Sequence, residues 1–306
     1  MSLRWRVNTT LTPKLAERYI KSQEWDLQID TINYFGQGWD NITFLVNDKI
    51  VFRFAKTDET AMLLKQENLV LPSLQNLSLQ IPNPIYIGRP NENNPYHFHG
   101  YEKLSGIPAY QIKLSDDDLK VCLEQLALFL KELHSFKHNS AQKLGALPVV
   151  CDRIKVNLVI KSLQERIQKL HDLKIVQFDQ SFIKQQIKAV QKISLNPAQN
   201  CLVHGDLDIR HLLVLDNRLS GIIDWGDVGI SHPVTDLAAI FYWFPVEMHD
   251  VFFKIYGSVS QDMQNYTRFL ALHRTITLMW YGHGIDDQTM FDVSLKAYEE
   301  LRRYQA

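Results

Sequence analysis

The sequence predicts an α+β fold in two lobes, with a small antiparallel sheet first and a larger, mainly helical part after it. Two observations support this division. Short alternating apolar runs separated by turn residues fill the chain up to residue 104, which is typical of antiparallel strands. Beyond that point, a capping box at Ser115-Asp116-Asp117-Asp118 opens a run with apolar residues three and four positions apart, which predicts a long amphipathic helix. We therefore expect residues 1–104 to form one lobe and residues 105–306 the other.

The first lobe is expected to begin with a helix from Thr12-Pro13 to Ser22, because threonine caps helix starts and proline suits the first helical turn. A glycine-containing turn at residues 35–41 and a tight turn at Asn47-Asp48 separate the apolar runs that follow. These and later runs predict a helix that Asp58 caps and that extends to Leu71, and strands at residues 25–34, 42–46, 50–55, 85–87 and 96–104.

The second lobe is expected to be mainly helical. After the long helix, residues 150–198 have helical patterns rich in lysine and glutamine, another helix begins near Asp236, and residues 245–306 continue in the same way. Residues 280–287 allow two interpretations, since this stretch combines aromatic, glycine and aspartate residues. It borders an acceptor pocket, or it is a glycine-rich connection between two helices.

The composition is that of an ordinary globular chain. Its 306 residues are 45% hydrophobic and 22% charged, with a formal net charge of -1, which gives no signal for nucleic acid or for a membrane surface. Cys122, Cys151 and Cys201 lie far apart without a metal-binding spacing, which favours reduced, buried thiols. No apolar stretch is long enough to span a bilayer, and we expect no signal peptide. A cytoplasmic monomer is the expectation that follows.

Residues 201–236 concentrate the chemistry of the chain. Apolar runs that predict short strands end in polar turns, which places Asp206, Asp208 and Asp224 at the ends of strands. Phosphoryl transfer requires a carboxylate that orients the attacking hydroxyl, a metal ligand five residues later and a second ligand after a neighbouring strand. Asp206, His211 and Asp224 have this spacing, with histidine where protein kinases have asparagine. The pattern predicts Asp206 as the catalytic base, and His211 and Asp224 as metal ligands.

The segments HGDLDIRHLLV and GIIDWGDVGISHPVTDLA resemble the paired motifs HGDxxxxN and IDWxxxxxGDPxxDLA of the aminoglycoside phosphotransferase family. The resemblance covers most of the chain. It implies a protein-kinase-like fold and transfer of the γ-phosphate of ATP or GTP to a hydroxyl of a small acceptor. In having histidine at position 211, where the family usually has asparagine, the chain is similar to the aminoglycoside 2″-phosphotransferase and macrolide phosphotransferase branches. His232 stands where the family usually has aspartate before Pro233.

The resemblance also implies a nucleotide site in the first lobe. Arg53 lies in the strand where the family usually has the lysine that grips the α- and β-phosphates, and Glu67 matches the helix glutamate that pairs with this cation. The carbonyl of Glu102 and the N–H of Leu104 match the segment between the lobes whose backbone holds the base. Glycines let the backbone approach phosphate closely. The nucleotide-binding residues implied are Gly36, Gly38, Arg53, Glu67, Glu102 and Leu104.

The metal that the resemblance implies is Mg²⁺, with Mn²⁺ as an alternative because His211 offers nitrogen where Mg²⁺ prefers oxygen. The acceptor stays open. An aminoglycoside would need carboxylates for its ammonium groups, and Asp208, Asp286 and Asp287 are the candidates. A macrolide would need a large apolar pocket, and a choline-like alcohol an aromatic cage. A kinase of a metabolic alcohol or sugar, such as homoserine or fructosamine, and a non-catalytic nucleotide-binding regulator are further alternatives.

Overall fold

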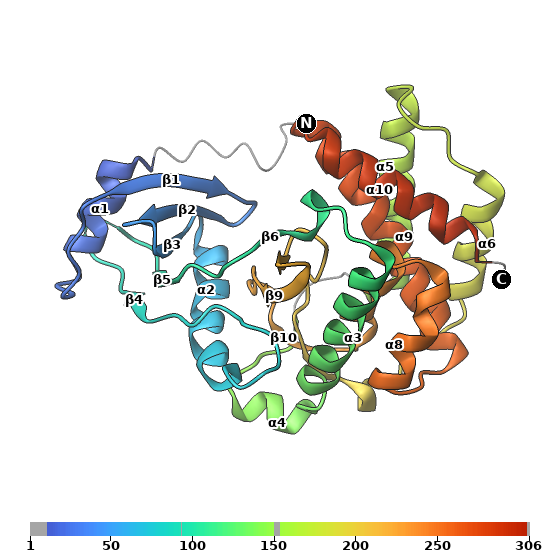
Figure 1. Cartoon of the computed structure of the whole chain (residues 1–306), viewed down its shortest axis with the longest axis horizontal. Coiled ribbons are helices and arrows are strands. Elements are labelled where there is room, and N and C mark those ends of the chain that lie inside the picture. The colour runs from blue at the N-terminus through green and yellow to red at the C-terminus, as the bar shows by residue number, and fades with distance from the viewer. Residues whose placement is uncertain (1–10, 93, 150–153, 305–306) are drawn as a thin grey trace.

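The computed structural model describes residues 11–92, 94–149 and 154–304. Figure 1 shows two lobes. The first contains an antiparallel sheet with helices α1 (Pro13–Lys21) and α2 (Asp58–Val70), and the second contains most of the helices around two small sheets. This confirms the predicted α+β arrangement of a small sheet lobe followed by a larger helical lobe.

The first lobe is built on a five-stranded sheet with the order β1-β2-β3-β5-β4. Its strands are β1 (Ile32–Gln37), β2 (Asn41–Val46), β3 (Ile50–Ala55), β4 (Tyr86–Gly88) and β5 (Phe98–Glu102). Phe52 and Phe54 of β3 are buried in an aromatic cluster that packs against α1. Because side chains alternate across a strand, Arg53 between them lies on the opposite face, away from α1. This alternation is what turns Arg53 towards the second lobe.

The strand predicted at residues 25–34 is wrong for most of its length, because β1 begins only at Ile32. The backbone N–H groups of Asp30 and Thr31 donate to Oδ1 of Asn47, at 2.8 and 3.0 Å, instead of to a neighbouring strand. A side-chain acceptor thus takes the place of a ladder partner. The predicted apolar alternation therefore marks packing beneath the sheet and not strand pairing.

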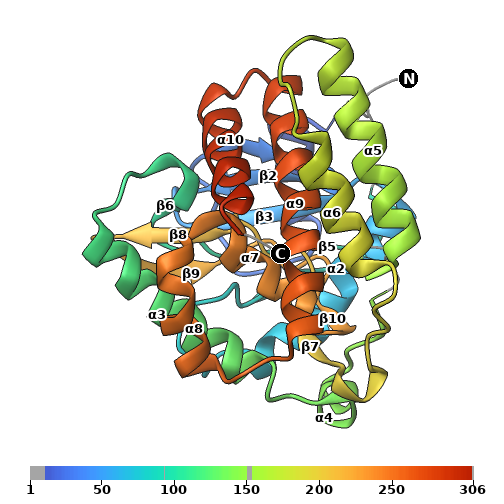
Figure 2. The same cartoon turned by 90° about the vertical axis from the view of Figure 1, so that its right-hand side faces the viewer.

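The second lobe is mainly helical, as predicted. Its helices are α3 (Asp116–Leu133), α4 (His138–Lys143), α5 (Val156–Asp172), α6 (Gln180–Val190), α7 (Val234–Trp243), α8 (His249–Tyr256), α9 (Gln261–Gly284) and α10 (Gln288–Arg302). Its strands are β6 (Ile107–Pro108), β7 (Cys201–Val203), β8 (Leu212–Leu215), β9 (Arg218–Ile222) and β10 (Gly229–Ser231), which form the sheets β6-β8-β9 and β10-β7. Figure 2 shows α5, α6, α9 and α10 grouped on the side of the lobe above α3 and α8.

The packing of the two lobes does not divide at residue 104, where the sequence suggested a boundary. Leu71, Leu74 and Ile81 are buried in the same hydrophobic core as the apolar face of α3, in the second lobe. The backbone of Gln80 also pairs with Ser220 and Ile222 beside strand β9. The segment after α2 therefore belongs to the core of the helical lobe, although the chain returns afterwards to complete the sheet.

Two expectations concern location and cysteine chemistry. Among the helices of the described residues, none combines the length and the apolar composition that a membrane span requires. Cys122 and Cys201 are buried free thiols, and burial raises the pKa of both, to about 11 and about 12. Such thiols are inert and serve packing. Cys151 lies outside the described residues.

Candidate active site

The loop from His204 to His211 joins β7 to β8 and is held from behind by Asp236, in the first turn of α7. The two carboxylate oxygens of Asp236 accept the backbone N–H groups of His204 and Gly205, at 2.8 and 3.0 Å, and His134 contacts one of them at 3.1 Å. Gly205 is required because its φ is +88° and a Cβ there would lie 2.2 Å from the carbonyl oxygen of Asp227. Asp236 therefore steadies the loop, as the sequence suggested.

Asp236→Ala is expected to lower the free energy of unfolding by about 3 kcal/mol, because three buried donors lose their acceptor and each such loss costs roughly 1–3 kcal/mol. Asp236→Asn keeps one acceptor oxygen and should lose less. Urea unfolding followed by circular dichroism measures both, with Asp26→Ala as the exposed control. Equal stability of Asp236→Ala and the control would contradict this bracing role.

The same carboxylate gives stability a pH dependence. Burial alone would raise the pKa of Asp236, but hydrogen bonding from His134 and Gly205 holds it below its ordinary value. A carboxylate with a depressed pKa in the fold stabilises the protein above its unfolded pKa of about 3.9 and loses that contribution as pH falls through the folded value. Wild-type stability should thus decline with acidification more steeply than that of Asp236→Ala.

His204 braces the same loop as a neutral side chain. Its Nε2–H donates to the carbonyl of Ile223 at 3.0 Å, and its Nδ1 accepts the N–H of Asp206 at 3.3 Å. Burial lowers the pKa of His204, which agrees with this neutral tautomer. The ring also packs on the fully buried Trp225, whose Nε1–H donates to the carbonyl of Ile222. The histidine and tryptophan of the two motifs therefore lock the loops that carry Asp206 and Asp224.

The carboxylate of Asp206 opens on the cavity between the lobes and faces two arginines. Its Oδ1 lies 2.5 Å from Nη1 of Arg274 on α9, and its Oδ2 lies 3.9 Å from Nη2 of Arg210 in the same loop. Asp206 is thus held at the cavity surface by a cation, in the position where a hydroxyl would have to be oriented.

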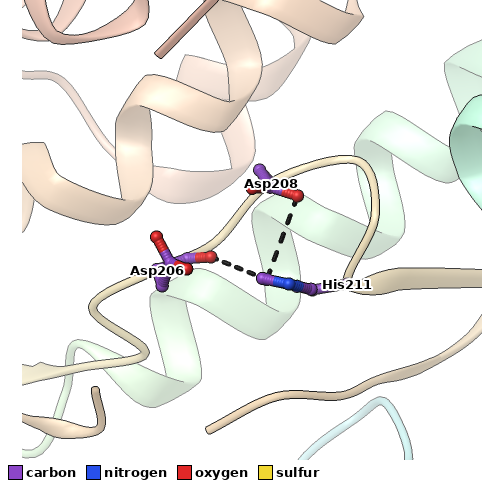
Figure 3. A group of neighbouring side chains, drawn as sticks. All are labelled: Asp206, Asp208 and His211. Atoms are coloured by element: carbon purple, nitrogen blue, oxygen red, sulfur yellow. Dashed lines mark hydrogen bonds and ion pairs between the residues drawn. The ribbon is translucent and has the colours of Figure 1, made fainter. Parts of the chain in front are cut away.

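His211 directs one ring nitrogen at Asp224. Its Nδ1 lies 2.8 Å from the backbone oxygen of Asp206 (Figure 3), and because a carbonyl only accepts, Nδ1 carries the proton. The other ring nitrogen, Nε2, lies 3.3 Å from Oδ2 of Asp224, and in the neutral tautomer it would offer its lone pair there. Two atoms bound to one metal ion at 2.0–2.1 Å are separated by about 3 Å. The pair consequently suits a divalent cation between the ring and the carboxylate.

Arg53 ties Asp224 to the first lobe. Its Nη2 lies 2.6 Å from Oδ1 of Asp224 and its Nη1 lies 2.6 Å from Oε2 of Glu67, with Arg53 and Glu67 both buried. Although burial by itself lowers the pKa of Arg53, the two carboxylates raise it above the ordinary value, so the guanidinium stays charged. Burial raises the pKa of Glu67 to about 7 against the attraction of Arg53. Burial likewise acts to raise the pKa of Asp224, but Arg53 and His211 keep it below its ordinary value.

One cavity of about 760 Å³ connects these groups. It is lined on the sheet side by Gly38, Trp39 and Arg53, and on the helical side by side chains from α5, α7, α9 and the loop that carries Asp206. Gly38 has open space where a Cβ would lie, and its carbonyl accepts Nζ of Lys56. The cavity is large enough for a nucleotide and a small acceptor together.

Other predicted nucleotide positions lie near this cavity but not all in its wall. Gly36 is part of β1, where its carbonyl accepts the hydroxyl of Thr43 at 2.9 Å. Glu102 and Leu104 line a second, open hollow of about 570 Å³. Between them, the N–H of Lys103 donates to the carbonyl of Lys49 at 2.7 Å.

The family profile that matches this chain is that of the phosphotransferase enzyme family, over residues 31–271. The match covers well over half of the sequence. The chain belongs to this family. As a member, it is a phosphotransferase.

Solved structures support the same assignment. The GDP and kanamycin complex of APH(2")-IIia is 26% identical over 94% of this chain and 98% of that chain, with a TM-score of 0.71. The GDP complex of wild-type aminoglycoside 2'-phosphotransferase-IIIa is 24% identical over 95% and 99%, with a TM-score of 0.72. A macrolide 2'-phosphotransferase type I shares the fold, at 18% identity over 97% and 99% and a TM-score of 0.62. The family resemblance that the motifs indicated is confirmed, and so is the kinase-like fold.

Two groups of side chains could hold a divalent cation, and the first is the predicted pair of His211 and Asp224. A second group, Asp206, Asp208 and His211, has ligand atoms within 4.8 Å of one another (Figure 3). Asp208, however, is held by Arg210, and Nδ1 of His211 already donates to the carbonyl of Asp206. The donors that remain available favour the histidine and aspartate pair.

His211→Ala is expected to weaken divalent metal binding roughly tenfold or more, since losing even an outer partner of a metal ligand costs 10–100-fold. His211→Asn supplies an oxygen ligand and should bind Mg²⁺ close to the wild-type level. Electron paramagnetic resonance titration with Mn²⁺, with a non-hydrolysable ATP analogue present, measures both variants. The control is His171→Ala, at an exposed position. If His211→Asn binds the metal as weakly as His211→Ala, then His211 is a packing residue only.

The three carboxylates proposed for an aminoglycoside acceptor lie elsewhere. Asp208 is fully buried and is bound by the guanidinium of Arg210 through two N–H groups. Burial acts to raise the pKa of Asp208, but Arg210 lowers it to about 2. Asp287 caps α10 by accepting the N–H of Met290 and takes the hydroxyl of Tyr110, and Asp286 precedes it in the connection between α9 and α10. Neither lines the cavity among the described residues. Residues 280–287 are thus the end of α9 and a helix connection, and Tyr281 within them lines the cavity.

The sequence analysis missed the residues that form the helical wall of the cavity. These are Ser162, Arg166, Arg210, His273, Arg274 and Thr277. Tyr281, which also lines this wall, lies in the stretch 280–287 for which a pocket border was one of the two interpretations. A signal was present for part of this set. Positions 273, 274, 277 and 281 recur at helical spacing and place polar groups on one stripe of a largely apolar helix. A half-buried polar stripe of this kind marks a wall that faces something other than the core.

Proposed function

We propose that this protein is a small-molecule kinase in which Asp206 is the catalytic base and Arg53, His211 and Asp224 hold the nucleotide end of the site. The carboxylate of Asp206 accepts the proton of the acceptor hydroxyl. That oxygen forms a bond to the γ-phosphorus, and the bond to the leaving nucleoside diphosphate breaks. The position of Asp206 at the cavity surface supports this role.

The phosphate end of the cavity is defined by Arg53. Its guanidinium is fixed by Glu67 and Asp224, so it presents its charge at little conformational cost. A divalent cation held by His211 and Asp224 would neutralise charge on the phosphate oxygens. The backbone around Gly38 provides close approach for the phosphates, and Glu102 and Leu104 are proposed to hold the base of ATP or GTP.

The observation that carries this proposal is that one cavity brings together four side chains, those of Asp206, His211, Asp224 and Arg53. Arg53 and Asp224 are 171 positions apart in the sequence. Turn residues that met by chance would not bring a base, a ligand pair and a buried cation to the same opening.

Transfer of label from γ-³²P-ATP and γ-³²P-GTP to a panel of hydroxylated acceptors tests the function. The panel should include aminoglycosides, a macrolide, choline, sugars, amino alcohols and hydroxy acids, with products separated by chromatography. We expect label in at least one acceptor, and none with Asp206→Asn at the same enzyme concentration. Tight nucleotide binding by calorimetry, without transfer or hydrolysis for any acceptor, would favour the non-catalytic regulator.

A further inference from the structure

The acceptor end of the cavity is walled by basic side chains. Arg166 and Ser162 come from α5, His273 and Arg274 from α9, and Arg210 from the loop of Asp206. Helices α5 and α9 pack against each other, and both run along the same side of the lobe in Figure 2. Their polar side chains therefore meet in one wall, which we call the basic wall, defined by Arg166, Arg210, His273 and Arg274.

The arginines of the basic wall differ in how far a neighbouring carboxylate neutralises them. Arg210 is neutralised by the buried carboxylate of Asp208, and Arg274 faces Asp206 at 2.5 Å. Arg166 contacts Nε2 of His273 at 3.0 Å, and no carboxylate of the described residues forms an ion pair with it. Burial lowers the pKa of Arg166, and the nearby positive charge of Arg274 lowers it further. Two partly buried arginines that repel each other are stabilised by an anion between or beside them.

Catalysis increases this imbalance. When Asp206 takes the proton of the acceptor hydroxyl, its carboxylate becomes neutral and no longer compensates Arg274. Arg274 would then face only partly compensating charge, from the carboxylate of Asp208 at 3.9 Å, which Arg210 already neutralises. Arg166 has no carboxylate ion-pair partner among the described residues. An anionic group carried by the acceptor restores the balance, whereas an ammonium group makes it worse.

The rest of the acceptor end is apolar or aromatic. Leu158, Leu270 and Leu278 line it, and Tyr281 carries Arg210 over its ring at 5.4 Å. No carboxylate other than Asp206 and Asp224 lines the helical side of the cavity among the described residues. A polycationic acceptor therefore finds no set of carboxylates here to receive its ammonium groups.

We propose that the acceptor is a small hydroxylated compound bearing an anionic group, a carboxylate or a phosphate ester, which binds Arg166 and Arg274. This rests on the proposed function of the same cavity. The anion also competes with Asp206 for Arg274, so acceptor binding releases the base for the hydroxyl. Arg274 then links recognition of the acceptor to freeing of the catalytic carboxylate.

Four compounds that share a pyranose ring and its 1-, 3- and 4-hydroxyls test the charge preference: glucose, glucosamine, glucuronate and glucose 6-phosphate, with kanamycin as the polycation. Label transfer from γ-³²P-ATP gives kcat/KM for each. We expect the anionic members to exceed glucose by about tenfold or more, since hydrogen bonds to charged groups contribute roughly 1.5–3 kcal/mol. The two anions tell whether the site prefers a carboxylate or a phosphate. Preference for glucose, glucosamine or kanamycin would overturn the proposal.

Arg166→Gln should remove most of the preference for anions by raising the acceptor KM, while kcat and the nucleotide KM change little. Arg166→Lys keeps the charge and should recover part of the preference. The control is Arg303→Gln, at the exposed end of α10, where the arginine pairs with Glu300 and Glu247, far from the residues that line the cavity. A rise in nucleotide KM with Arg166→Gln would mean that the basic wall binds the nucleotide phosphates, which contradicts the proposal.

Calorimetric titration of the four sugars, with a non-hydrolysable ATP analogue present, separates this inference from the proposed function. Anion binding that depends on Arg166, without transfer to any acceptor, would overturn the catalytic proposal and leave the anion site standing. Transfer to neutral sugars, with equal binding of glucose, glucuronate and glucose 6-phosphate, would overturn the anion site and leave the proposed function standing.

Discussion

Asp206→Asn is expected to reduce turnover by about 100-fold or more, which is the usual scale for loss of a positioned general base. The amide has almost the same shape as the carboxylate, so the loop held by Asp236 and His204 should keep its position. Nucleotide affinity should change by only a few fold, because Asp206 faces the acceptor end while Arg53 and Asp224 lie at the phosphate end.

Label transfer and calorimetric nucleotide binding measure the two effects separately. Asp216→Asn is the matched control, since Asp216 is an exposed residue in the turn between β8 and β9. Near-normal turnover of Asp206→Asn with an acceptor that the wild type uses would remove Asp206 from the role of base. A large loss of nucleotide affinity would instead place this carboxylate at the phosphates.

The parts of the fold that the sequence predicted are those governed by neighbouring residues. Asn47-Asp48 and Asp216-Asn217 have φ between +50° and +59°, as expected of the two-residue hairpin turns that these residue types favour. Ser115 caps α3 as the capping box indicated. The cap of α2 was displaced by one residue, because Thr57 and not Asp58 accepts the N–H of Thr60.

The parts that the sequence did not predict depend on contacts between distant segments. Residues 71–81 pack in the core of the helical lobe and pair with strand β9. No local sequence pattern predicts this contact. The basic wall unites Arg166 with Arg274 across 108 positions of sequence, so only the packing of α5 on α9 makes it a site. For Asp208, by contrast, the contact that decides its role comes from a residue close to it in the sequence. Its partner Arg210 is only two positions away, and the pair removes this carboxylate from the acceptor site.

The motif spacing singled out the proposed base and metal ligands because each lies near the end of a strand in one small region. Residue spacing defines the separation of Asp206 and His211 within a single loop, and β8 and β9 form a hairpin that returns the chain to Asp224. Apart from Arg210, the basic wall that we propose to bind the acceptor comes from helices outside this region, so the motifs do not reveal the acceptor chemistry. This is why the reaction type could be predicted while the acceptor class could not.

Arg53→Ala is expected to raise the Kd and KM for nucleotide by about tenfold or more, because a charged contact to phosphate contributes roughly 1.5–3 kcal/mol. The substitution also leaves Glu67 buried without its partner, and breaking a buried ion pair from one side costs about 3–5 kcal/mol of stability. Asp224 loses the contact that fixes one of its oxygens. Acceptor binding, which involves the opposite end of the cavity, should hardly change.

Arg53→Lys should rescue only part of the loss, because one ammonium group cannot reproduce the two separate contacts that the planar guanidinium makes with Glu67 and Asp224. Calorimetry with ATP or GTP measures the affinity, and urea unfolding measures the stability of the same samples. Arg218→Ala, which breaks an ion pair with Asp118 outside the cavity, is the control. If Arg53→Ala loses stability but binds nucleotide normally, Arg53 only joins the two lobes, and the phosphates must be held by other groups of the cavity.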